Sequence, residues 1–211
     1  MLSEKTDARA RQDLFERINT GSDELKPIEV IKGAYRGIFY DFVKECSKNK
    51  LFLKLCPISE KRALREEGPQ RVLRYFAYTE NLKNYKNYRG RVSQFIIAYI
   101  KSKSHKGIFN KQMKTNMKND FDNMLNFVDK YFPYGFAKSK TAKSTPRVRF
   151  EAISIGVHFA LKENPDIKPT NIVDWLESSD FKFQTRSDAA NNTTKVKNRI
   201  NFVKNRLLGE K

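Results

Sequence analysis

The sequence predicts an all-α fold, an irregular multi-helix bundle of about eight helices, from three observations. Apolar residues recur at intervals of three and four along almost the whole chain, which is the spacing of one face of a helix. No run of alternating apolar and polar residues is long enough to indicate a β-strand. Hydrophobic residues make up 39% of the 211 positions, which is enough for one sizeable core.

The helical pattern divides the chain into amphipathic segments separated by turn residues. These segments lie at residues 8–18, 27–46, 72–77, 92–100, 113–132, 148–161, 172–176 and 189–208. Between them, residues 51–55 form a short apolar piece closed by Pro57, and Gly68-Pro69 is expected to break the next segment. Thr170 is expected to cap the short helix that follows Pro169.

Two segments have regular apolar stripes that predict buried faces. One carries Met113, Met117, Phe121, Leu125, Val128 and Phe132, a pattern more typical of a core than of a cofactor site. The last segment carries Val196, Ile200, Val203 and Leu207, with Lys195, Arg199 and Arg206 on one side of the stripe and Lys197 and Lys204 on the other. We expect this helix to pack on the domain with its basic edges in water; a helix lying on a membrane surface is the alternative.

The polar, basic residues 138–145 are interpreted as a linker. They divide the chain into a helical region at residues 1–137 and a C-terminal helical region at residues 146–211. Both regions are expected to belong to one helical body.

The net charge predicts a polyanionic partner. The chain carries 42 Lys and Arg against 24 Asp and Glu, a formal charge of +18, and nucleic acid is the commonest polyanion. The alternative is a basic protein whose charge has no specific partner.

The charge is concentrated in an interval without acidic residues, between Glu80 and Asp120. The predicted nucleic-acid-binding residues there are Lys83, Lys86, Arg89, Arg91, Lys101, Lys103, Lys106, Lys111 and Lys114, and Lys118 closes the run. Tyr85 and Tyr88 lie among the first charges and are expected to stack on bases or bond to phosphate. A second acid-free run holds Lys138, Lys140, Lys143, Arg147 and Arg149. An ordinary solvated face is the alternative for both runs.

A separate motif, Leu14-Phe15-Glu16-Arg17-Ile18-Asn19-Thr20-Gly21, precedes a helix expected to start at Pro27. Main-chain N–H groups in a loop beside a helix N-terminus can hold an anion. Arg17 would add a planar donor fork for phosphate, and Asn19 a polar side chain. Alternatively, both residues only tie down a tight turn between helices.

This motif resembles the F-x-R-I-N-T-G…L…E motif of the GmrSD type of modification-dependent restriction proteins. Residues 71–78, 149–152 and 191–200 resemble three later helices of that family, in the same order. The resemblance implies a ParB/sulfiredoxin-like domain with an Asp-Gly-Gln-Gln-Arg motif, followed by a helical region. It also implies that Arg17, Asn19, Thr20 and Gly21 belong to a nucleotide site, occupied in the complete assembly by a nucleoside triphosphate with Mg.

The chain departs from the family pattern where the chemistry should be. It has no Asp-Gly-Gln-Gln-Arg motif and no His-Asn-His motif, and its two histidines, His105 and His158, are isolated. No catalytic residue, metal ligand set or phosphate-binding glycine loop is recognisable. The expected function is a helical module of a ParB-like restriction or anti-phage defence protein. It would bind DNA and complete a nucleotide site supplied by a missing domain or a partner chain.

Two alternatives stay open: a stand-alone nucleic-acid-binding or interaction protein with no nucleotide role, and a remnant without activity of its own.

Cys46 and Cys56 lack metal-site spacing, which indicates buried, reduced thiols in a cytoplasmic protein. No stretch of about 18 apolar residues is present, so we expect no membrane span. The charged N-terminus predicts no signal peptide.

Overall fold

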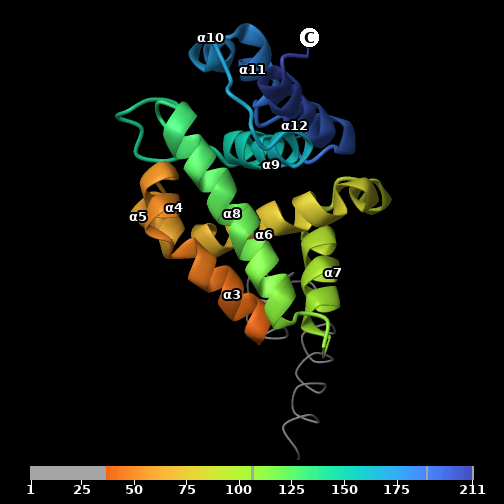
Figure 1. Ribbon diagram of the computed structural model, residues 1–211. Helices are drawn as coiled ribbons and strands as arrows, with labels where there is room; N and C mark the ends of the chain where they lie inside the picture. Colours follow the sequence, from red (N-terminus) through yellow and green to blue (C-terminus); the bar gives the residue numbers. More distant parts are fainter. Residues whose placement is uncertain (1–36, 106, 189, 211) are drawn as a thin grey trace, which may run out of the picture.

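The computed structural model describes residues 37–105, 107–188 and 190–210, and this part of the chain is all-α, without strands (Figure 1). Its α-helices are α3 (Ile38–Ser47), α4 (Lys50–Leu55), α5 (Glu60–Ala63), α6 (Glu67–Asn81), α7 (Val92–Ser104), α8 (Lys111–Tyr131), α9 (Arg147–Glu163), α10 (Ile172–Glu177), α11 (Ser179–Gln184) and α12 (Thr193–Leu208). A 3-10 helix, η1 (Leu82–Tyr88), connects α6 to α7. The predicted fold class is confirmed.

The long apolar stripe of α8 lies where the sequence predicted it. Met117, Phe121, Leu125, Val128 and Phe132 are buried, and Met113 packs against the core from its edge. The stripe of α12 is buried throughout, at Val196, Ile200, Val203 and Leu207. Periodicity therefore located both of these faces correctly.

Several helix boundaries differ from the sequence-based expectation. Gly68-Pro69 does not break a segment: it lies in the first turn of α6, where Pro needs no hydrogen-bonded N–H group. α10 follows Asn171, whose φ is +57°, and not Thr170. α12 begins at Thr193, because the Asn192 side chain accepts hydrogen bonds from the N–H groups of Thr194 and Lys195.

Helix α9 lies at the centre of the described fold. It packs against α12 on one side and against α6 and α8 on the others (Figure 1). Apolar side chains therefore surround most of its circumference. Gly156 allows the closest approach, since a Cβ atom there would lie 2.6 Å from Cβ of Val203 on α12.

Residues 138–145 lie outside the helices, and two hydrogen bonds fix the C-terminal end of this loop to the preceding region. The Thr145 N–H donates to the Pro57 carbonyl at 2.8 Å, and Arg71 Nη2 donates to the Thr145 carbonyl at 2.7 Å. The helices before and after this loop share one continuous hydrophobic core.

A buried carboxylate connects three of these helices. Glu151 on α9 is 1% exposed and accepts hydrogen bonds from Arg74 Nη1 of α6, at 2.8 Å, and from Arg199 Nη2 of α12. Burial alone would raise the pKa of Glu151, but the two guanidinium groups outweigh it and hold that pKa below its ordinary value. The expectation that Arg199 lies on a solvated edge is wrong: it is 1% exposed, because it is the partner of this carboxylate.

A second buried carboxylate, Glu67, holds the start of α9. Arg147 donates to both of its carboxylate oxygens, at 3.0 and 2.7 Å, and Arg71 donates to one of them at 3.3 Å. Arg71 also donates to Cys56 Sγ at 3.0 Å.

Cys46 and Cys56 are free and buried, as the sequence predicted, and burial raises the pKa of the Cys46 thiol to about 12. Neither cysteine is poised as a nucleophile.

The first prediction concerns Glu151. Replacing Glu151 by Ala leaves Arg74 and Arg199 buried without a counter-charge, so the free energy of unfolding should fall by about 3–5 kcal/mol. Glu163→Ala is the matched control, because Glu163 forms an exposed ion pair with Lys204 on the same two helices. The control should lose less than about 1 kcal/mol in the same urea titration. Equal losses in the two variants would contradict the assigned role of Glu151.

The second prediction is a pH dependence due to His158, whose Nδ1 lies 3.0 Å from the hydroxyl of buried Tyr75. Burial lowers the pKa of His158 from 6.5 to about 4, so the unfolded chain binds this proton first as the pH falls. Its contribution to stability is complete above about pH 6.5 and is lost towards pH 4.

Between about pH 7 and about pH 5 the free energy of unfolding should therefore fall by about 2 kcal/mol on account of His158. His158→Gln should remove this part of the fall, while His105→Gln, at an exposed position, should keep it. Glu67 and Glu151 have lowered pKa values, so their contribution to the free energy of unfolding is lost only as the pH falls through those folded-state pKa values. This loss occurs at a more acidic pH than the loss due to His158. An unchanged pH profile in His158→Gln would show that another group titrates.

Candidate nucleic-acid interface

The sequence of the 3-10 helix η1 repeats the triplet Lys-Asn-Tyr, as Lys83-Asn84-Tyr85 and Lys86-Asn87-Tyr88. A 3-10 helix has three residues per turn, so every third side chain lies in the same row. The row with Tyr85 and Tyr88 faces the core, whereas Lys83 and Lys86 are exposed on a row of their own. The repeat therefore aligns basic groups on the outside of the helix.

Tyr85 anchors η1 and is not available to a ligand. It is fully buried, its ring lies 5.1 Å from Phe95, and its hydroxyl donates to the Asn191 carbonyl at 2.5 Å. Tyr88 is half-buried against the same Phe95. The expectation that Tyr85 stacks on bases is therefore wrong, because packing against α7 and the segment before α12 occupies its ring and its hydroxyl.

The turn after η1 lies against the start of α12. Arg89 and Gly90 have left-handed φ values of +48° and +83°, and a Cβ atom at Gly90 would lie only 3.0 Å from the Asn191 carbonyl oxygen. Only glycine combines this backbone conformation with so close an approach. The turn consequently places Arg89 and Arg91 beside the N-terminus of α12.

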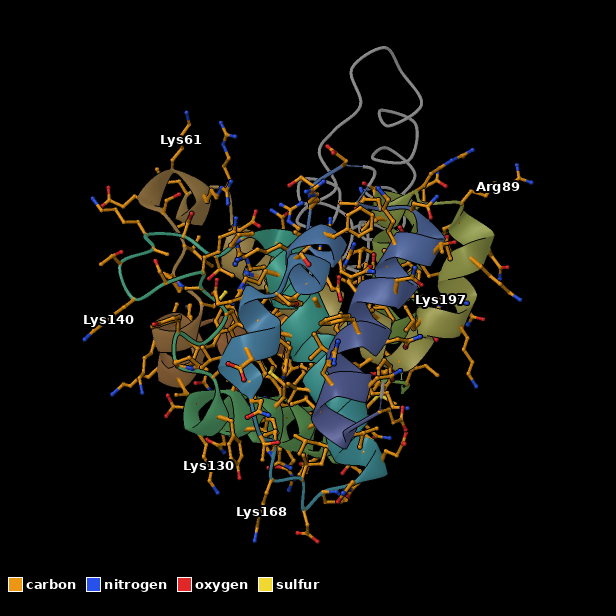
Figure 2. The ribbon with its side chains drawn as sticks, turned by 90° about the horizontal axis from the view of Figure 1, so that it is seen from above. Lys61, Arg89, Lys130, Lys140, Lys168 and Lys197 are labelled. Atoms are coloured by element: carbon orange, nitrogen blue, oxygen red, sulfur yellow. The ribbon has the colours of Figure 1, made fainter. Side chains whose placement is uncertain are left out.

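Helix α12 adds two exposed lysines, Lys195 and Lys197, in its first turns. Lys195 Nζ donates to the main-chain carbonyl of Asp188 at 2.8 Å, which leaves its positive charge uncompensated. Figure 2 shows Arg89 and Lys197 on the same side of the molecule. We call the whole set the η1–α12 surface: Lys83, Lys86, Arg89, Arg91, Lys195 and Lys197.

The η1–α12 surface differs from other basic regions because none of its six residues forms an ion pair with a carboxylate of the described residues. Elsewhere many lysines are neutralised locally, in the pairs Lys54–Asp129, Lys114–Glu45, Lys118–Asp122, Lys162–Asp120, Lys182–Glu177 and Lys204–Glu163. Unpaired charges produce the larger field and release more counterions when they meet phosphates.

The remaining residues of the predicted basic run are distributed differently. Lys103 is buried and paired with Glu80 at 2.5 Å, so it contributes little to a surface field. Lys114 pairs with Glu45, and Lys106 lies outside the described residues. Lys101 is exposed about 14 Å along the axis of α7 from its first residue, and Lys111 is exposed at the start of α8. The run therefore does not form a single patch.

The second acid-free run is divided in the same way. Lys138, Lys140 and Lys143 are exposed on the loop. Arg147 binds Glu67, and Arg149 is buried, with its Nε donating to the Ala137 carbonyl at 3.1 Å. Both arginines therefore hold elements of the fold together, Arg147 through an ion pair and Arg149 through a main-chain carbonyl.

The residues predicted to belong to a nucleotide site, Arg17, Asn19, Thr20 and Gly21, lie outside the described residues. Over the part of the chain that is described, no group of His, Cys, Asp and Glu could hold a metal ion. None of its helices is both long and apolar enough to cross a membrane. Sequence reasoning placed Lys195 and Lys197 on the basic edges of the last helix but did not include them among the nucleic-acid-binding residues; the absence of acidic residues between Asp188 and Glu210 was the available signal.

Comparison with known proteins gave no relative: no protein-family model, no curated protein and no solved structure matches the chain.

Proposed function

We propose that the chain binds DNA through the η1–α12 surface, as a helical module of a ParB-like restriction or anti-phage defence protein of the cytoplasm. The observation that carries the DNA-binding part is the set of six exposed basic side chains on two adjoining elements, none paired with a described carboxylate. The overall charge of +18 favours the same class of partner.

The geometry suits the phosphate backbone better than the bases. Lys83 and Lys86 are separated by one turn of a 3-10 helix, an axial rise of about 6 Å. Two cationic groups at this separation can meet neighbouring phosphates of one DNA strand. Asn84 and Asn87, also exposed, can donate to phosphate or sugar oxygens. Because Tyr85 is buried, the binding proposed is electrostatic and insensitive to base sequence.

The second part of the proposal rests on the resemblance to the GmrSD type alone. In it, residues 17–21 complete a nucleotide site on a partner chain or domain with the Asp-Gly-Gln-Gln-Arg motif, using a nucleoside triphosphate with Mg. Hydrolysis assayed with and without that domain, and with Arg17→Ala, separates this function from a stand-alone nucleic-acid-binding protein. In the stand-alone case DNA binding stays and the added domain changes nothing.

The third prediction tests the η1–α12 surface by the salt dependence of binding. For a labelled DNA duplex of arbitrary sequence, fluorescence anisotropy should give a steep linear fall of log K with log salt concentration. Replacing Lys83, Lys86, Arg89 and Arg91 together by Gln should reduce the magnitude of this slope by about 3 to 4, since each lost phosphate contact removes about 0.9.

The matched control replaces four other lysines by Gln: Lys54, Lys114, Lys118 and Lys182. It lowers the net charge by the same amount, but these lysines already have carboxylate partners in the fold. The control should keep most of the salt slope. Equal slopes in the two variants would mean that net charge, and not this surface, determines binding.

A further inference from the structure

Helices α8 and α9 enclose a cleft on another side of the molecule. Its volume is about 640 Å³, within the size range of small-molecule sites. α8 contributes Asn123, Asn126, Phe127, Lys130 and Tyr131, which recur at three- and four-residue spacing and therefore share one face. The opposite wall comes from the end of α9 and from residues 165–168, where the chain turns away from α8.

His158, one of the residues that line the cleft, is only 9% exposed. Its Nδ1 lies 3.0 Å from the Tyr75 hydroxyl, and the same hydroxyl donates to the Asp120 carbonyl at 3.2 Å. The Asp120 carbonyl can only accept a hydrogen bond, so the Tyr75 hydroxyl must use its single proton for that bond. The hydroxyl oxygen of Tyr75 therefore accepts the hydrogen bond from Nδ1–H of His158. This arrangement leaves Nε2 of neutral His158 as an acceptor with no hydrogen-bond partner among the described residues.

The mouth of the cleft is positively charged. Lys130 and Lys168 have no carboxylate partner among the described residues, whereas Lys162 is neutralised by Asp120 at 2.7 Å. Asp166 supplies one further carboxylate at the rim. Figure 2 shows Lys130 and Lys168 close together, on the side of the molecule away from Arg89. The cleft is thus separate from the η1–α12 surface.

We propose that the α8–α9 cleft binds a nucleoside monophosphate. Phe127 and Tyr131 provide an apolar aromatic wall for a base, and Asn123 and Asn126 provide paired donors and acceptors for its edge. His158 accepts from an N–H group of the base. Lys130 and Lys168 at the mouth meet the phosphate.

The test is isothermal titration of the full chain with AMP, GMP, CMP and UMP, and separately with inorganic phosphate. At least one nucleotide should bind saturably with a Kd of about 1 mM or tighter, and phosphate alone should bind more weakly than that nucleotide. Asn126→Ala and Lys130→Ala should each weaken its binding by about fivefold or more, as expected for the loss of one polar contact.

Two controls separate the cleft from other sites. Asn119→Ala lies on the same helix but outside the cleft, and should bind the nucleotide like the unmodified chain. The fourfold Gln variant of Lys83, Lys86, Arg89 and Arg91 should also bind it normally while losing DNA affinity. The proposal is overturned if no nucleotide gives saturable heat, if phosphate binds as tightly, or if the fourfold variant loses nucleotide binding. The DNA-binding proposal is tested separately, by the anisotropy titration.

Discussion

The buried carboxylate of Glu151 is the interaction on which the arrangement of the helices depends most. An ionised carboxylate inside a protein is costly unless charged groups surround it, and here Arg74 and Arg199 reach it from two different helices. Both arginines would themselves be unfavourable at their positions without Glu151. The three residues therefore require α6, α9 and α12 to be docked in one arrangement. That docking places the start of α12 beside η1, where the exposed charges gather.

The charges of the chain are used in two ways. Buried or half-buried arginines, such as Arg71, Arg147 and Arg199, hold elements together through carboxylates and main-chain carbonyls. The lysines and arginines of the η1–α12 surface have no carboxylate partner among the described residues, and the one main-chain contact of this set, from Lys195 to the Asp188 carbonyl, leaves its charge in place. An excess of +18 thus does not by itself identify a binding surface; the absence of local carboxylates does.

Periodicity was sufficient to predict the fold class and the buried faces of α8 and α12, because both depend on local spacing. It could not predict that Arg199 is buried, because its partner Glu151 lies 48 residues away in sequence. The same is true of Lys103, which looked exposed until the fold placed Glu80 beside it. The repeat of three residues in η1 was readable, and would have assigned Tyr85 to the core.

Lysine footprinting can show whether DNA contacts the η1–α12 surface. The chain is acetylated under mild conditions with and without a DNA duplex, and the modification of each lysine is quantified by mass spectrometry. Protection by DNA should concentrate at Lys83, Lys86, Lys195 and Lys197, while Lys61 and Lys140, exposed elsewhere (Figure 2), stay reactive. Protection spread evenly over all exposed lysines, or centred on Lys61 or Lys140, would contradict the account.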